Sequence, residues 1–179
     1  MAPAMLQLIL GLIPLLTGAA WSCALCFYDL KWRILPNWLT LGGAAVALAG
    51  RLGFGGWPFF LDGFAAAAGA GAFLLVPFLM RGAGGGDVKM LFAVGAIVGW
   101  DKLLLMLWVT SLAGLVMGVA MLVSGHLDGA RLKHFMRCAF DWRYDRKAGA
   151  ACLPPKESAR YRIPFSVPIA VGLIVALVW

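Results

Sequence analysis

Six long apolar runs, joined by segments that hold most of the charge, restrict how this chain can fold. Hydrophobic residues make up 63% and charged residues 13% of the 179 residues. Soluble domains are closer to half apolar and a quarter charged. A transmembrane helix needs about 20 mostly apolar residues. We therefore expect an all-α, polytopic membrane bundle of about six transmembrane helices, formed by one domain over residues 1–179.

The limits of the expected spans follow the apolar runs. They are 5–28, 38–54, 58–80, 88–100, 103–123 and 163–179. The run at 88–100 is the shortest, so either it thins the bilayer or the glycine-rich loop before it lies below the membrane surface. No Lys or Arg precedes the first run, whereas a secretory signal has a basic start. We expect a retained first span.

The basic residues are distributed unevenly between the connecting segments. Of 15 Lys and Arg residues, all but Arg51 and Lys102 lie in, or directly flank, the segments that follow the first, third and fifth runs. Because Lys and Arg concentrate on the cytoplasmic side of a membrane protein, we expect these three segments in the cytoplasm and the N-terminus outside. The net charge of +7 then reflects topology, and we expect no nucleic-acid partner.

The third of these segments, residues 124–162, is predicted to be a basic cytoplasmic loop. Apolar residues recur at helical spacing within 131–143. This stretch is predicted either to lie as an amphipathic helix on anionic membrane lipids or to extend the fifth span.

Two isolated carboxylates are the candidate reactive groups. Asp29 follows the first run, and Asp87 ends a Gly84-Gly85-Gly86 loop just before the fourth. The predicted topology places both at the cytoplasmic face, where ionisable residues at a bilayer edge usually have a function. One carboxylate can deprotonate water while a carboxylic acid protonates the leaving nitrogen of a peptide bond. We therefore predict that the two acids form a hydrolytic pair.

The surroundings of Asp87 favour this chemistry. Gly84 and Gly86 leave the backbone open to an extended substrate, which could add main-chain hydrogen bonds. The dipole of the following helix favours the anion of Asp87.

Other polar residues are assigned structural or surface positions. Cys23 and Cys26 form a CxxC, but no second ligand pair follows at the spacing of a zinc site, so we expect packing residues, no metal and no cofactor. We expect Asp62 and Asp101 to be hydrated residues near the outer ends of spans.

Two other classes of function remain open. Paired acids also occur in small transporters and proton-relay proteins, and the chain could be a non-catalytic component of a larger assembly. The sequence shows no internal repeat, and both acids are predicted on one face, unlike many transporters.

Three motifs together resemble the type IV prepilin peptidases, a branch of the GxGD membrane aspartic proteases. Gly84-Gly85-Gly86-Asp87 fits GxGD, and Val88-Lys89 after it is similar to the prepilin branch. The stretch from Asp29 to Pro36-Asn37 is similar to the first-acid region, with Leu35 as a mild departure. The final run opens with Ile163-Pro164-Phe165-Ser166-Val167-Pro168-Ile169-Ala170, which resembles the last helix of the family.

The resemblance implies an enzyme that removes a short basic leader from a prepilin at the cytoplasmic face. Asp29 and Asp87 would be the catalytic pair, with Gly84, Gly86, Lys89, Pro36 and Asn37 in support. Lys89 would steady the Asp87 anion or meet a substrate carboxylate; the alternative is an interfacial lysine that reaches toward the membrane surface. The expected location is the bacterial inner membrane, with multiple spans.

The same resemblance indicates which form of prepilin peptidase the chain is similar to. The first run begins almost at Met1, so we expect the short form that lacks an N-terminal methyltransferase region and serves tight-adherence (Flp-type) pili. Archaeal preflagellin peptidases are also short but fit less closely. The implied partners are a prepilin precursor, membrane lipids and the pilus-assembly machinery, and the sequence defines no oligomeric state.

Overall fold

The structure is a computed structural model that describes residues 2–79, 83–124 and 164–179. In these residues the chain forms helices and no strands: α1 (Ala2–Trp32), α2 (Asn37–Leu79), α3 (Gly85–Val98), α4 (Trp100–Val123) and α7 (Ser166–Val178). The expected all-α fold is confirmed for the described part. The predicted loop 124–162, with its amphipathic stretch 131–143, lies outside it except for Ser124.

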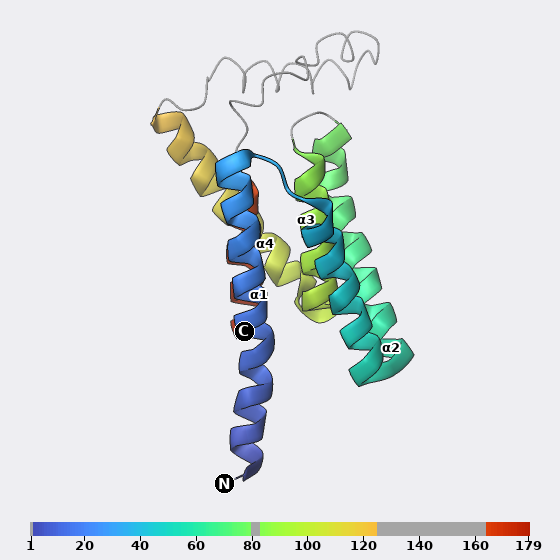
Figure 1. Ribbon diagram of the computed structural model, residues 1–179. Helices are drawn as coiled ribbons and strands as arrows, with labels where there is room; N and C mark the ends of the chain where they lie inside the picture. Colours follow the sequence, from blue (N-terminus) through green and yellow to red (C-terminus); the bar gives the residue numbers. More distant parts are fainter. Residues whose placement is uncertain (1, 80–82, 125–163) are drawn as a thin grey trace.

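Helix α2 contains two of the expected spans. A straight helix of 43 residues would measure about 65 Å, roughly twice the thickness of a bilayer core. Gly56 interrupts it with a left-handed φ of 67° and a ψ of −162°, values that glycine adopts without steric cost. The arms 37–55 and 57–79 fold back on each other, so α2 is a helical hairpin (Figure 1).

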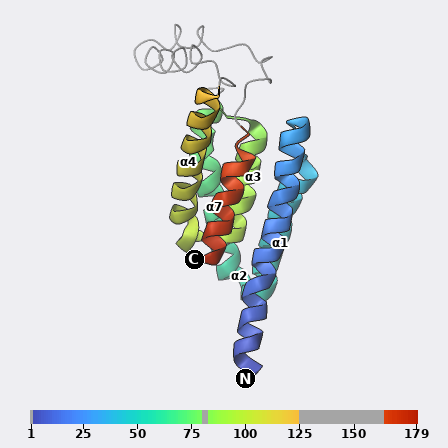
Figure 2. The ribbon, with the colours of Figure 1, turned by 90° about the vertical axis from the view of Figure 1, so that its left-hand side faces the viewer.

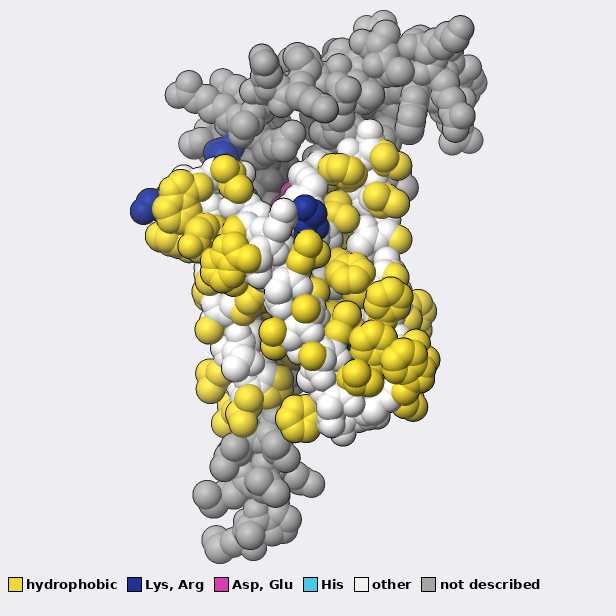
Figure 3. All heavy atoms as spheres, turned by 45° about the vertical axis from the view of Figure 1, so that its right-hand side comes forward, with side chains coloured by type: hydrophobic (Ala, Val, Ile, Leu, Met, Phe, Trp, Pro, Cys, Tyr) yellow, Lys and Arg dark blue, Asp and Glu magenta, His cyan; other side chains and the backbone are white. Residues whose placement is uncertain are grey.

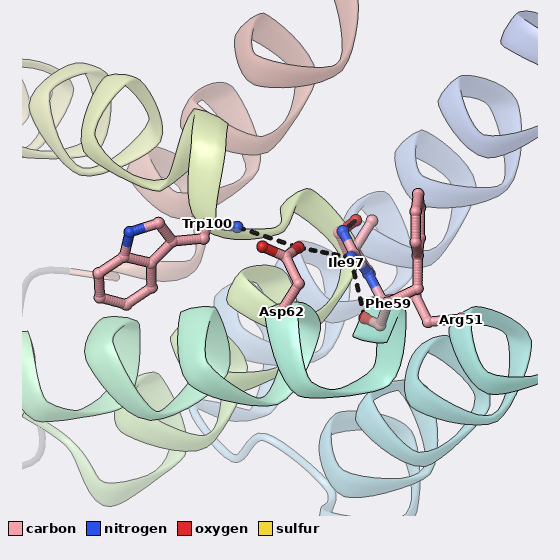
Figure 4. A network of polar contacts seen from close by, with 5 residues as sticks. All are labelled: Arg51, Phe59, Asp62, Ile97 and Trp100. Atoms are coloured by element: carbon pink, nitrogen blue, oxygen red, sulfur yellow. Dashed lines mark hydrogen bonds and ion pairs between the residues drawn. The ribbon is translucent and has the colours of Figure 1, made fainter. Parts of the chain in front are cut away.

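A polar network joins the α2 hairpin to the last turn of α3 and to the first residue of α4. Arg51 on the first arm forms a 2.8 Å ion pair with Asp62 on the second arm. Its guanidinium also donates to the carbonyl of Ile97, while Asp62 accepts from the backbone N–H of Trp100 (Figure 4). The side chain of Asp62 is 39% exposed, which agrees with the expected hydrated position, but its ion pair with Arg51 was not predicted.

Close helix contacts depend on small residues. Helix α3 packs mainly against α2, where Ala66, Ala70 and Gly95 let the two backbones approach. Helix α7 packs mainly against α4 and α1 and lies between them (Figure 2). The core that these helices enclose contains Leu25, Met90, Leu91, Val94, Met106, Ile169 and Leu173.

The surface of the bundle is largely apolar. Figure 3 shows apolar side chains over most of the described surface, with the visible Lys, Arg and acidic side chains near the top of the view. Exposed Leu104, Trp108, Leu112 and Leu115 follow one face of α4. Such a surface fits lipid, because lipid chains are as apolar as these side chains.

Within the described residues, three helices are long and apolar enough to cross a membrane: α1 from Leu12, α2 and α4. Helices α3 and α7 have 14 and 13 residues, fewer than the about 20 of a full span. The six-span count and the outer N-terminus therefore stay predictions.

Candidate active site

Asp29 lies in the last turn of α1. The helix ends because Arg33 adopts a left-handed φ of 53° and its N–H returns to the carbonyl of Asp29 at 2.9 Å. A residue with a Cβ in this conformation costs roughly 1–2 kcal/mol relative to glycine. The chain then turns sharply toward α2, and the carboxyl group of Asp29 is left half-buried at the end of the bundle.

Asp87 occupies the first turn of α3, which begins after Gly84. The backbone N–H of Gly84 donates to Asp87 Oδ2 at 3.0 Å, and the N–H of Asp87 donates to the carbonyl of Gly84 at 3.1 Å. Only 8% of the residue is exposed. Helix α3 begins three residues before the expected Val88, so the glycines form part of the helix start, and Asp87 lies where the helix dipole favours an anion.

One cleft of about 350 Å³ brings the two acids together. This volume lies at the lower end of ordinary small-molecule sites, which range over roughly 300–1,000 Å³. The lining residues are Asp29, Leu30, Arg33, Ile34, Leu35, Asn37, Gly84, Gly85, Gly86, Asp87, Lys89 and Pro164. Of the seven site residues suggested by the sequence, all but Pro36 line this cleft.

Pro36 acts behind the cleft wall. Its carbonyl accepts the backbone N–H groups of Leu39 and Thr40, each at 3.1 Å, and so starts α2. Asn37 is thereby directed to the cleft, where its Oδ1 accepts a 2.8 Å hydrogen bond from Lys89 Nζ. The expected alternatives for Lys89 did not include this partner, which joins α3 to the first arm of α2.

Leu35 and Gly86 are in close contact with each other in the wall of the cleft. A Cβ added to Gly86 would lie 2.9 Å from Leu35 Cβ, closer than real side chains approach. Glycine at this position therefore lets the loop 33–36 pack directly against the start of α3.

Sequence reasoning also missed a contact between Asp29 and the last helix. The hydroxyl of Ser166, the first residue of α7, donates to Asp29 Oδ2 at 2.5 Å. The motif around Pro164 predicted the helix, but no local pattern links residues separated by 137 positions.

No group of three potential metal-ligating side chains gathers within the described residues. The cleft brings together two carboxyl groups, one of them poorly hydrated, and such a pair can supply general acid–base chemistry. The fold and site define a class: a membrane-type helical bundle with a paired-acid cleft at one end.

Comparison with known proteins gives the family. The model of the type IV leader peptidase family matches residues 16–119, which is more than half of the chain and includes both acids. The chain therefore belongs to the type IV leader peptidase family. Membership of this family indicates that the protein is a peptidase, which is a kind of hydrolase. No curated protein and no solved structure matches the chain.

Proposed function

We propose that the protein is a membrane-embedded aspartic endopeptidase that removes the short basic leader of type IV, Flp-like prepilins at the cytoplasmic face. Asp29 and Asp87 are its catalytic pair. The observation that carries the proposal is that both carboxyl groups line one cleft and lie within the segment that matches a leader peptidase family.

The proposed reaction needs one ionised and one protonated carboxyl group. The ionised group takes a proton from water, and the oxygen of that water attacks the scissile carbonyl carbon. The protonated group gives its proton to the leaving nitrogen as the carbon–nitrogen bond breaks. Two adjacent carboxyl groups share one proton readily, because their like charges oppose full ionisation of both.

The glycine-rich start of α3 supplies the substrate platform in this proposal. Gly84, Gly85 and Gly86 line the cleft without bulky side chains. An extended leader–helix junction can therefore lie against the backbone beside Asp87 and add main-chain hydrogen bonds. Arg33 and Lys89 line the same cleft and are placed to contact acceptor groups of the bound precursor.

The proposed topology has one multi-pass peptidase domain in the bacterial inner membrane, with six spans and an outer N-terminus. Asp29 and Asp87 lie at the same end of the bundle, as this topology requires. The basic residues near this end, which include Lys31 and Arg33, favour the cytoplasmic side.

The family match favours the peptidase over the other classes that the sequence left open. A transporter or a proton-relay protein has no need of a glycine-lined cleft inside a leader peptidase segment. A non-catalytic assembly component has no need of two acids in it.

Coexpression with an Flp-type precursor tests the proposal. We expect Asp29→Asn and Asp87→Asn variants to accumulate in the membrane at normal levels but to lose leader removal, read as a mobility shift on gels. Asp101→Asn is the matched control, because Asp101 is an exposed acid in the first turn of α4 and outside the cleft. Normal processing by either cleft variant would refute the acid-pair mechanism.

The same experiment tests the absence of methylation. Intact mass spectrometry of the mature pilin is expected to give an unmodified N-terminus when this protein is the sole peptidase. A mass increase of one methyl group would refute that part of the proposal.

A further inference from the structure

Ser166 is the one described residue of α7 whose side chain is hydrogen-bonded to a proposed catalytic acid. Its Oγ lies 2.5 Å from Asp29 Oδ2, and the residue is fully buried. A separation this short is typical of a hydroxyl that donates to a carboxylate, and such charge-assisted bonds are roughly twice as strong as neutral ones.

The position of this hydroxyl is set by helix packing. Helix α7 begins at Ser166, and the N–H of Ile169 bonds to the carbonyl of Phe165 at 3.1 Å. At Gly172, α7 packs closely against Thr110 and Met106 of α4. Near its end, Leu177 of α7 packs against Gly18 of α1. A donor on an element that is held on two sides defines its acceptor more precisely than a donor on a loop.

Asp29 itself has little else to fix it. It lies in the last turn of α1, half-buried, next to a connection that leaves the helix at Arg33. A free carboxylate there could rotate toward solvent. The bond from Ser166 holds Oδ2 and so restricts the rotation of the carboxyl group.

Cys26, one turn before Asp29 on α1, contacts the same hydroxyl. Ser166 has a single hydroxyl proton, and the 2.5 Å separation assigns that proton to Asp29 Oδ2.

We propose that Ser166 is a positioning residue that orients Asp29 for catalysis from the last helix. This inference rests on the proposed function, in which Asp29 is one of the two catalytic acids. Ser166 lies outside the segment 16–119 that matches the family, so the match does not include this residue.

Steady-state kinetics on the purified full chain, with a precursor peptide that spans the cleavage site, test the proposal. Loss of a hydrogen bond to a charged group predicts that Ser166→Ala lowers kcat roughly ten- to a hundredfold. The KM should stay within about twofold, because the serine orients a reacting group and not the substrate. Ser166→Thr, which keeps the hydroxyl, should recover most of the lost kcat per folded molecule.

Ser22→Ala is the matched control. Ser22 is another fully buried serine, and its hydroxyl donates to the carbonyl of Ala19 in its own helix, away from the cleft. Thermal unfolding in detergent should change by similar amounts in Ser22→Ala and Ser166→Ala, while only Ser166→Ala loses kcat. Equal loss of kcat in both, or no recovery by threonine, would overturn the positioning role.

Asp29→Asn separates failure of this inference from failure of the proposed function. If Asp29→Asn is inactive and Ser166→Ala has normal kcat, the positioning role is wrong and the acid pair stands. If Asp29→Asn itself keeps normal activity, the proposed function is wrong, and the inference fails with it.

Discussion

At the scale of single residues, the two acids of the cleft are held by donors of different origin. The N–H of Gly84, three residues before Asp87, reaches its carboxyl group at 3.0 Å, whereas the donor to Asp29 comes from Ser166 on the last helix. The first contact is local and follows from an acid placed in the first turn of a helix. The second exists only once α1 and α7 have packed together.

Gly86 provides a residue-scale prediction. An added Cβ would meet Leu35 Cβ at 2.9 Å, and both residues line the cleft. Gly86→Ala should therefore displace the loop 33–36, and with it Arg33 and Asn37, and lower the rate of leader removal by about tenfold or more. The overpacking itself should cost about 1–3 kcal/mol of stability.

Gly42→Ala is the control for this prediction, because nothing lies within 4 Å of a Cβ at Gly42 and this residue does not line the cleft. Gel assays of precursor processing should rank Gly42→Ala well above Gly86→Ala. Equal processing by the two variants would contradict a close Leu35–Gly86 wall.

At the scale of elements, α3 is fixed at both ends. Its start forms the cleft beside Leu35, and its end carries the Ile97 carbonyl that accepts from Arg51. The Arg51 side chain is 17% exposed and the Asp62 side chain 39%, so water shields only part of the attraction between them. The network thus ties the end of α3 that is remote from Asp87 to both arms of α2.

The contact between α2 and α3 gives a prediction at this scale. A Cβ at Gly95 would lie 2.6 Å from the backbone oxygen of Ala66, which cannot yield without separating the helices. Gly95→Ala should therefore lower stability by about 1–3 kcal/mol, measured by thermal unfolding in detergent. Processing activity should fall with it, since α3 carries Asp87.

Gly50→Ala is its counterpart, because nothing lies within 4 Å of a Cβ at Gly50. Alanine favours a helix over glycine by about 1 kcal/mol, so this variant should be neutral or slightly more stable. A Gly95→Ala variant that unfolds no earlier than Gly50→Ala would show that α2 and α3 do not pack as described.

The sequence predicted most of the helices because their apolar runs are long and their breaks contain Gly and Pro. The reversal in α2 falls at Gly56, between the expected spans that end at Phe54 and begin at Pro58. The start of α3 was placed three residues late, since a glycine run is typical of a loop. In this fold, Gly84 accepts and donates hydrogen bonds as the cap, so the helix begins among the glycines.

At the scale of the whole molecule, the sequence predicted that the two acids lie close to each other. It did not predict the tertiary contacts around them. Asp29 and Asp87 were identified from their isolated charge and their motifs. The Arg51–Asp62 pair and the Ser166–Asp29 bond depend on how the hairpin closes and how α7 lies between α1 and α4. No local pattern encodes such tertiary contacts, because the partners lie on different helices.

In the proposed mechanism the two acids at the end of the bundle act together as one catalytic unit. When two catalytic groups act together, an enzyme loses nearly all of its activity when either group is removed, and removing both lowers the activity little further. Independent groups instead give losses that multiply.

The most direct test is the rate of leader removal by the purified wild type, Asp29→Asn, Asp87→Asn and the double variant on one precursor. The account predicts that each single variant falls to the same background rate and that the double variant is no slower. A single variant that retains a substantial rate, or a double variant whose loss is the product of two partial losses, would contradict it.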